Sequence, residues 1–258
     1  MISPQASIDP KAKIGINVEI GPFTTIYGNV EIGEGTWIGP NVTIMDGARI
    51  GKNCRIFPGA VISAIPQDLK FDGEDTTVEI GDHTTIRECV TINRGTSDKW
   101  ATKVGSHCLL MAYVHLAHDV TVGDYCILAN TANIAGHVHI EDHVIIEGVV
   151  AVQQFVRIGQ HSFVAGGSLV RKNVPPFVKA AREPLTYAGV NTIGLRRRGF
   201  EDQAIAYIED VYRTLYVHNS NMTTAVRVAD VELPNSEEKD VILNFIREST
   251  KGIIRGPV

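Results

Sequence analysis

ISPQAS-IDPKAK-IGINVE-IGPFTT-IYGNVE-IGEGTW, residues 2–37, places an isoleucine at every sixth position. The same register continues to Val170, and 26 of its 29 positions hold Ile, Leu or Val. The three exceptions are Asp68, Glu74 and Asp98. Aliphatic residues make up roughly a quarter of an average chain, so this spacing does not arise by chance. A repeat of six residues therefore decides the fold of the first two-thirds of the chain.

A second column of small or β-branched residues lies four positions after the first. It includes Cys54, Cys108 and Cys126, which we expect to be buried packing residues. One large and one small inward residue in every six indicate a short strand followed by a corner. Three such strands, each forming one side, complete one coil. A helix would instead need a period of 3.6. The chain is therefore predicted to be mainly β, with residues 1–176 forming stacked coils of parallel strands.

Two stretches depart from the register and are predicted to leave the coils as loops, at about residues 63–79 and 94–103. Long excursions from a rigid scaffold are frequently functional. An ordinary solvated surface loop is the alternative for each.

The pattern becomes helical after the repeat ends. Apolar residues follow 3–4 spacing from Phe200 to Leu215, which predicts an amphipathic helix. Two further helices are expected, one over residues 223–231 and one that begins at Asn235. Residues 177–258 are therefore predicted to be a connecting segment and a small α-helical C-terminal domain.

Composition excludes several classes of protein. The net charge of −5 argues against a general nucleic-acid binder. No apolar run approaches the roughly 18 residues that span a bilayer, and Met1–Gln5 lacks the features of a signal peptide. The four cysteines form no CxxC pair, which argues against a zinc ribbon and a disulfide scaffold. We therefore expect a cytoplasmic protein without membrane insertion.

One edge of the predicted coils gathers residues that could carry chemistry. Residues 18 positions apart stack at about 4.8 Å, so His118 stacks on Gly136 and then on Gln154, and Asp119 stacks on His137. A neutral imidazole beside a carboxylate is suited to act as a general base, and a glycine N–H can hold an oxyanion. The alternative is that outward corners merely tolerate polar residues, since four further histidines occupy equivalent positions: His83, His107, His143 and His161.

A metal centre is a second alternative for these histidines. Some hexapeptide-repeat proteins are zinc-dependent carbonic anhydrases, and His115, His118 and His137 could supply three imidazole ligands. The carboxylate next to His118 and the motifs described next have no place in such an enzyme. We therefore expect no metal.

Several motifs together make the chain resemble the UDP-N-acetylglucosamine O-acyltransferases, hexapeptide-repeat enzymes that form a left-handed parallel β-helix. The HxxHD pattern alone is a weak signal, but QDLK and RRGF at these separations make it strong. The resemblance runs over nearly the whole chain. Its carriers are Gln67-Asp68-Leu69-Lys70, Ile86-Arg87-Glu88, Thr91-Ile92-Asn93-Arg94-Gly95-Thr96, His115-Leu116-Ala117-His118-Asp119, Ile127-Leu128-Ala129-Asn130, Ala135-Gly136-His137-Val138, Val174-Pro175-Pro176, Gly189-Val190-Asn191 and Arg196-Arg197-Arg198-Gly199-Phe200.

The resemblance implies transfer of an (R)-3-hydroxyacyl chain from acyl carrier protein to the 3-hydroxyl of UDP-N-acetylglucosamine, the first step of lipid A biosynthesis. The carrier thioester is the donor, and no cofactor is expected. His118 matches the general base, Asp119 its partner and Gly136 the oxyanion donor. The expected substrate-binding residues are Gln67, Asp68, Lys70, His115, His137, Gln154, Gly166, Asn191, Arg197 and Arg198.

These substrate-binding residues match different parts of the substrate. Asp68 and Lys70 match loop residues that hold the sugar, and Asn191 and the two arginines match positions near the nucleotide and diphosphate. Gly166 matches a position that limits acyl length. A convex corner cannot enclose a substrate by itself, so we expect a homotrimer with the site between subunits.

Some positions depart from the family. The family often has His where this chain has Asn93 and Gln153, and a carboxylate where it has Ile193. Acyl length and the choice between a 3-hydroxyl and a 3-amino acceptor stay open. An N-acyltransferase of the same pathway, a coenzyme A-dependent acyltransferase and a non-catalytic scaffold are the alternatives. The N-acyltransferases carry a uridine-binding domain before the repeats, for which the repeat starting at Ile2 leaves no room.

Overall fold

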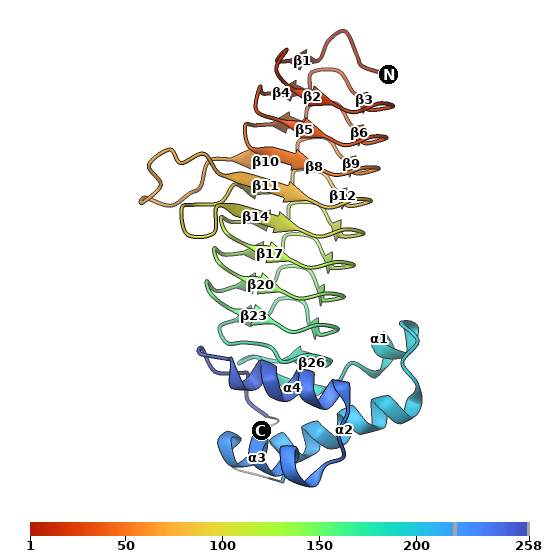
Figure 1. The fold of residues 1–258 in the computed structure, drawn as a ribbon, viewed down its shortest axis with the longest axis vertical. Coiled ribbons are helices and arrows are strands. Elements are labelled where there is room, and N and C mark those ends of the chain that lie inside the picture. Colours follow the sequence, from red (N-terminus) through yellow and green to blue (C-terminus); the bar gives the residue numbers. More distant parts are fainter. Residues whose placement is uncertain (219–220, 257–258) are drawn as a thin grey trace.

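The six-residue repeat forms a three-sided left-handed parallel β-helix (Figure 1). The computed structural model describes residues 1–218 and 221–256. Each coil gives one short strand to each of three sheets, and partners in neighbouring coils lie 18 residues apart, as Ser7 lies beside Thr25. Parallel pairing in register stacks like residue on like, which is why the isoleucine column is continuous.

Up to residue 170, consecutive strands belong to the three sheets in turn. The first sheet contains β1 (Ser7–Ile8), β4 (Thr25–Ile26), β7 (Thr43–Ile44), β10 (Val61–Ala64), β13 (Thr91–Asn93), β16 (His115–Leu116), β19 (Asn133–Ile134), β22 (Ala151–Val152) and β25 (Leu169–Val170). The second sheet contains β2 (Lys13–Ile14), β5 (Glu31–Ile32), β8 (Ala48–Ile50), β11 (Thr77–Ile80), β14 (Ala101–Val104), β17 (Thr121–Val122), β20 (His139–Ile140) and β23 (Arg157–Ile158). The third sheet contains β3 (Glu19–Ile20), β6 (Trp37–Ile38), β9 (Arg55–Ile56), β12 (Thr85–Ile86), β15 (Leu109–Leu110), β18 (Ile127–Leu128), β21 (Ile145–Ile146), β24 (Phe163–Val164), β26 (Val178–Ala181) and β27 (Thr186–Val190).

The interior of the β-helix is a column of aliphatic side chains, with the small column beside it. Cys54, Cys108 and Cys126 are buried and free, as predicted. These thiols also bond between coils, since the Cys108 Sγ–H donates to the Gly123 carbonyl at 3.1 Å. Burial raises the pKa of the Cys54 thiol to about 11, so this thiol is a packing group rather than a nucleophile.

Two loops interrupt the coils on one side of the β-helix (Figure 1). The first joins β10 to β11 and the second joins β13 to β14. Strands β11 and β14 each pair over four residues, so the excursions span residues 65–76 and 94–100 and are shorter than the sequence indicates. Both loops leave the corner where the first sheet passes into the second.

The C-terminal part begins by extending the third sheet. Strand β26 pairs with β24 in parallel, and β27 returns antiparallel to it. Helices α1 (Thr192–Arg197), α2 (Asp202–Tyr216), α3 (Met222–Glu232) and α4 (Glu237–Arg247) follow. Helix α4 is capped by Ser236, whose side chain accepts from the Lys239 N–H, one residue later than the sequence indicated. Helix α1 was not predicted.

Candidate active site

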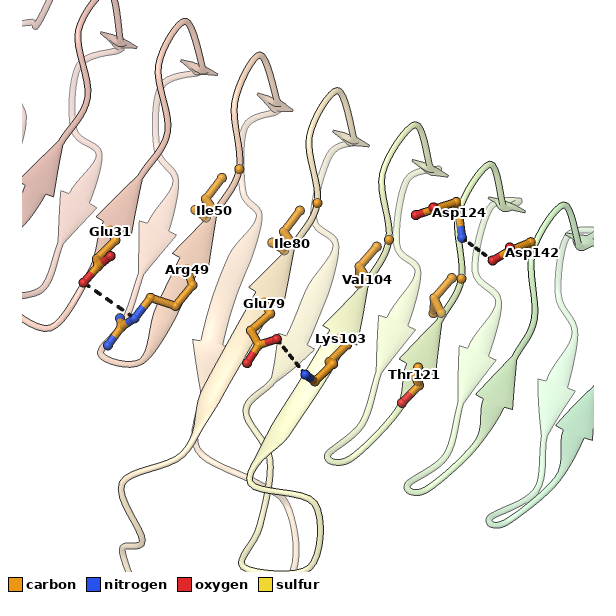
Figure 2. Close-up of a pocket in the computed structure, with 15 residues that line it drawn as sticks. Glu31, Arg49, Ile50, Glu79, Ile80, Lys103, Val104, Thr121, Asp124 and Asp142 are labelled. Atoms are coloured by element: carbon orange, nitrogen blue, oxygen red, sulfur yellow. Dashed lines mark hydrogen bonds and ion pairs between the residues drawn. The ribbon is translucent and has the colours of Figure 1, made fainter.

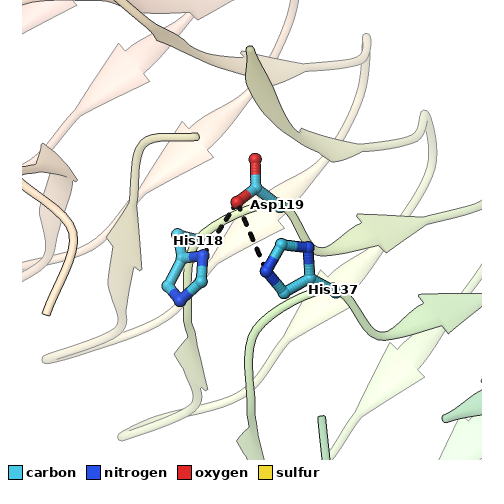
Figure 3. A group of neighbouring side chains, drawn as sticks. All are labelled: His118, Asp119 and His137. Atoms are coloured by element: carbon cyan, nitrogen blue, oxygen red, sulfur yellow. Dashed lines mark hydrogen bonds and ion pairs between the residues drawn. The ribbon is translucent and has the colours of Figure 1, made fainter. Parts of the chain in front are cut away.

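The chemistry-bearing residues lie at the corner between the first and second sheets. We call residues 117–119 and 135–137, from two neighbouring coils, the site corner. The His118 Nδ1 lies 2.8 Å from the Asp119 Oδ2. The imidazoles of His118 and His137 both face this carboxylate (Figure 3). Asp119 has the left-handed backbone that each corner requires, with φ of 59°. His118 and Asp119 are only 5% and 2% exposed, although they project outward from the coil.

The next coil places Gly136 against the His118 ring. A Cβ at this position would lie 2.7 Å from the His118 Cε1 and Nε2, so only glycine leaves room for the imidazole. Its neighbour His137 meets the His118 ring edge-on, with 4.9 Å between centroids, and stacks on Phe155 at 4.6 Å. The structure therefore confirms the predicted stacking of His118 on Gly136.

The second loop holds the Asp119 carboxylate from outside. The Thr96 N–H donates to Oδ1 at 2.9 Å, and the Thr96 hydroxyl donates to Oδ2 at 2.6 Å. The Lys99 N–H adds a longer bond of 3.3 Å to Oδ1. Burial acts to raise the pKa of the Asp119 carboxyl, but the hydrogen bonds from Thr96 and His118 outweigh it, and the pKa falls below its ordinary value. Asp119 is therefore a fixed anion.

The first loop brings a second carboxylate to the other side of His118. The Asp68 Oδ2 lies 3.9 Å from the His118 Nε2, and the Lys70 N–H donates to the Asp68 Oδ1 at 3.0 Å. Asn93 ties this loop down, because its side-chain amide donates to the Ile65 carbonyl at 3.1 Å. The distance of 3.9 Å is too long for a hydrogen bond, and the Nε2 of His118 has no close partner among the described residues.

Two neighbouring cavities open at this corner. One, of about 380 Å³, is lined by Gln67, His115, Ala117, His118, Asn133, Ile134, Ala135, Gly136, Ala151, Val152 and Gln154. The other, of about 480 Å³, is lined by Asp68, Lys70, Glu74, Thr96, Ser97, Asp98, His137 and Phe155. Burial lowers the pKa of His115, whose Nδ1 lies 2.8 Å from the Thr91 hydroxyl. His115 is therefore a neutral lining residue at neutral pH.

Comparison with known proteins identifies relatives over nearly the whole chain. A family model described as "Udp N-acetylglucosamine O-acyltransferase; Domain 2" matches residues 173–254, and the bacterial transferase hexapeptide model matches residues 29–64 and 101–136. An acyl-[acyl-carrier-protein]–UDP-N-acetylglucosamine O-acyltransferase of Sulfurihydrogenibium sp. is 55% identical over 98% of this chain and 93% of its own. The chain belongs to this family.

Solved structures of the family share the whole fold. The UDP-N-acetylglucosamine acyltransferase from Bacteroides fragilis 9343 superimposes with a TM-score of 0.97 at 50% identity, over 99% of this chain and 100% of that one. The one from Francisella novicida gives 0.96 at 41% identity, over 100% and 95%. No helix among residues 1–218 and 221–256 is long and apolar enough to cross a membrane.

The residues that match the family's nucleotide contacts lie elsewhere in the chain. Asn191 is buried at the start of α1, where its amide donates to the His161 carbonyl at 2.9 Å. Arg197 and Arg198 follow at the end of that helix, and one buried guanidinium nitrogen of Arg198 has no partner among the described residues. The loops of the site corner and α1 project to opposite sides of the β-helix (Figure 1). A single chain therefore does not bring these residues to His118.

Gly166 lies at a third corner, between the third and first sheets. The Gly166 N–H donates to the Glu147 carboxylate at 2.9 Å, and the Gly167 N–H donates to the Gly148 carbonyl. Gly148 and Gly166 are therefore neighbours, as their spacing indicates. The Glu147 side chain covers part of the strip that they form.

A metal ion does not suit the site corner. His118, Asp119 and His137 offer one ligand atom each within 4.8 Å. However, the two Asp119 oxygens already accept four hydrogen bonds, which uses the roughly four lone-pair sites of a carboxylate. The arrangement fits a carboxylate that orients a histidine, and we assign no metal.

A further groove of about 580 Å³ follows the outer face of the second sheet (Figure 2). It is crossed by ion pairs between Glu31 and Arg49 and between Glu79 and Lys103. None of the residues expected from the family lines it. The ion pairs bind neighbouring coils together on an exposed face, and we assign them no chemical role.

Sequence reasoning missed Thr96, Asp98 and Lys99 as partners of the site corner. The Asp98 Oδ2 lies 3.1 Å from the His137 Nδ1. One signal was present, because Asp98 is a polar residue at a register position that is otherwise aliphatic. That signal marks a loop but does not say which corner the loop covers.

Proposed function

We propose that the chain transfers an (R)-3-hydroxyacyl group from acyl carrier protein to the 3-hydroxyl of UDP-N-acetylglucosamine. The observation that carries this proposal is the His118 ring. Its Nδ1 is bound to Asp119, while its Nε2 faces a cavity beside Gly136. Relatives that match nearly the full length are named acyl-[acyl-carrier-protein]–UDP-N-acetylglucosamine O-acyltransferase, which supports the choice of carrier and nucleotide sugar.

The reaction needs only residues of the chain and the two substrates. The His118 Nε2 takes the proton of the sugar 3-hydroxyl as its oxygen attacks the thioester carbonyl. The Gly136 N–H, which donates no hydrogen bond within the described residues, holds the oxyanion. The oxyanion collapses, the carbon–sulfur bond breaks, and the carrier thiolate recovers the proton from His118. Asp119 keeps the ring in the required tautomer.

The remaining residues of the two cavities are proposed to bind substrate. Asp68 and Lys70 present a carboxylate and an ammonium group to the sugar. The other proposed contacts from these cavities are Gln67, His115, His137 and Gln154. Gly166, at the third corner, is proposed to contact the acyl chain outside them. No cofactor enters this scheme, because the thioester itself is the activated donor.

We also propose a homotrimer in which Asn191, Arg197 and Arg198 of one copy complete the site of another. Their position on the opposite side from the loops supports this arrangement. A second support is the outer face of the third sheet, where half-buried apolar residues stack in register, whereas the second sheet carries charges there. This apolar column is Leu109, Ile127, Ile145 and Phe163. Light scattering that shows an active monomer would contradict the trimer.

The test of the function is to mix the chain with UDP-N-acetylglucosamine and carrier proteins bearing 3-hydroxyacyl groups of several lengths. Mass spectrometry should detect the acylated nucleotide sugar, and the panel of lengths should reveal the preferred acyl chain. A parallel reaction with a 3-amino acceptor distinguishes O-acylation from N-acylation. Absence of product with every donor would refute the proposal. The cytoplasmic location stays a prediction, supported by four free cysteines.

A further inference from the structure

Thr96 is the residue that holds the Asp119 carboxylate at both oxygens. Its N–H reaches Oδ1 at 2.9 Å and its hydroxyl reaches Oδ2 at 2.6 Å. Thr96 is 8% exposed and Asp119 is 2% exposed, so water does not replace these bonds. Hydrogen bonds to a buried charged group are stronger than neutral ones. The carboxylate therefore owes its orientation to a loop that the repeat itself does not specify.

The hydroxyl of Thr96 is oriented toward Asp119. Its oxygen accepts from the Asp98 N–H at 3.3 Å, which leaves the hydroxyl hydrogen for Asp119. The oxygen that receives it, Oδ2, is the same oxygen that accepts from the His118 Nδ1 at 2.8 Å. Two donors thus share one acceptor, and each reduces the electron density that is available to the other.

We propose that Thr96 is a positioning residue that fixes the Asp119 carboxylate and limits its pull on the His118 proton. This inference rests on the proposed function of His118 as general base. With the Thr96 hydroxyl present, Oδ2 is a weaker acceptor and the imidazolium is less stabilised. The His118 imidazolium then loses its proton, and becomes the neutral base, at lower pH. Without the hydroxyl, the ring keeps that proton to higher pH, and the carboxylate is free to rotate.

Other charged groups face the pair, and none of them is substituted in the Thr96 variants. Asp68 lies 3.9 Å from the His118 Nε2, and the His137 Nε2 lies 3.9 Å from the Asp119 Oδ2. Asp98 contacts His137 at 3.1 Å. The Thr96 variants therefore keep the same set of charges, and only Thr96→Val and Thr96→Ala lose the bond from the Asp98 N–H to the hydroxyl, which Thr96→Ser retains.

The experiment compares Thr96→Val, Thr96→Ala and Thr96→Ser with the unchanged chain in the acyl-transfer reaction. Valine and alanine remove the hydroxyl, and serine keeps it. We expect the rising limb of the profile of kcat/KM against pH to move to higher pH in the valine and alanine variants. We expect kcat to fall on the order of 10-fold, with KM for the nucleotide sugar nearly constant. Serine should restore both the limb and kcat.

Two controls separate this role from a merely structural one. Asp119→Ala removes the acceptor altogether and should move the limb to lower pH, in the opposite direction. Thr102→Val removes the hydroxyl that accepts from the Asp119 backbone N–H at 2.9 Å, without touching the carboxylate. It should lower the melting temperature and leave the limb in place.

A readout that needs no activity keeps the inference distinct from the proposed function. NMR of histidine-labelled chain, with the His118 signal assigned from His118→Asn, gives the titration midpoint of the ring. We expect a higher midpoint in Thr96→Val and in Thr96→Ala. If one variant does not fold, the midpoint of the other tests the inference by itself. An unchanged or lower midpoint, or an equal shift in Thr102→Val, overturns the inference. If the unchanged chain forms no acylated sugar, the proposed function fails instead.

Discussion

Two corners of the same coils carry histidines at the same backbone position, and only one of them has the geometry of an active site. The ladder corner, between the second and third sheets, contains His83, His107, Tyr125, His143 and His161. His137 of the site corner and His143 of the ladder corner have the same φ of 60°. Each also stacks on the ring of the next coil at 4.6 Å, on Phe155 and His161 respectively.

The difference between the corners comes from the loops. Within the described residues, the ion pairs of histidine are all at the site corner, and they involve Asp68, Asp98 and Asp119. Two of these carboxylates arrive on loops. The ladder corner receives no loop, and its rings stack on one another until Phe200 covers His161. A histidine at a corner is therefore a packing residue unless an excursion brings it a carboxylate and closes it from water.

The largest effect is expected from removing the general base of the site corner. His118→Ala should lower kcat by about 10²–10⁴-fold or more, because it removes the general base. His118 projects outward from the coil but is only 5% exposed, so the melting temperature should fall as well. Steady-state kinetics and thermal unfolding measure the two effects. His107→Ala, at the exposed part of the ladder corner, is the matched control and should keep turnover. Near-normal turnover in His118→Ala would contradict the assignment.

A second change displaces the base without removing it. Gly136→Ala puts a methyl group 2.7 Å from the His118 ring, so the imidazole must move. A displacement of about 1 Å at a reacting group costs on the order of 100-fold in rate, and we expect that loss in kcat. Gly28→Ala is the control, since its Cβ meets only the flexible Asp9 side chain at 3.2 Å. Equal rates in the two variants would show that the close approach at Gly136 has no function.

The ladder corner should affect how stability depends on pH rather than turnover. Burial lowers the pKa of His161 to about 3, below the value of about 6.5 of an unfolded chain. The unfolded state therefore binds the proton more readily, so stability is fully present above pH 6.5 and is lost as pH falls toward 3. At pH 5 the loss from this group is about 2 kcal/mol.

His161→Phe should remove that loss and still stack between His143 and Phe177. The measurement is the free energy of unfolding at pH 7 and pH 5, where the variant should show the smaller difference. His83→Phe, at the exposed end of the ladder corner, should leave the difference unchanged. The same acid sensitivity in His161→Phe and the unchanged chain would refute this account.

The smallest effect concerns the outermost carboxylate of the site corner. The Asp98 side chain is 60% exposed, whereas the His137 side chain that it contacts is 13% exposed. Exposed ion pairs contribute at most about 1 kcal/mol, so Asp98→Asn should lower kcat by roughly 2- to 5-fold. Asp72→Asn, in the exposed part of the other loop, is the control. A loss as large as that of His118→Ala would mean that His137, not His118, is the central histidine.

The coils and most of the site corner can be predicted from the sequence, and the reason is physical. Parallel strands pair in register, so a spacing of 18 residues fixes which side chains are neighbours, as it does for His118 and Gly136. Loops have no such register. Thr96 reaches Asp119 only because the loop folds back over the corner, and no periodicity encodes that path. Helix α1 escaped prediction because six residues give too short an apolar pattern.

The lengths of the two loops have a consequence for how this kind of chain tolerates change. Partners across the first loop lie 30 residues apart, as Val61 and Thr91, and those across the second lie 24 apart, as Thr91 and His115. By polymer statistics, closing 30 residues instead of 18 costs only about 0.5 kcal/mol. A residue added within a loop is absorbed there, whereas one added within a coil puts every later side chain of that strand out of phase. The chain can therefore lengthen or shorten at its active site while the column beneath it keeps its phase.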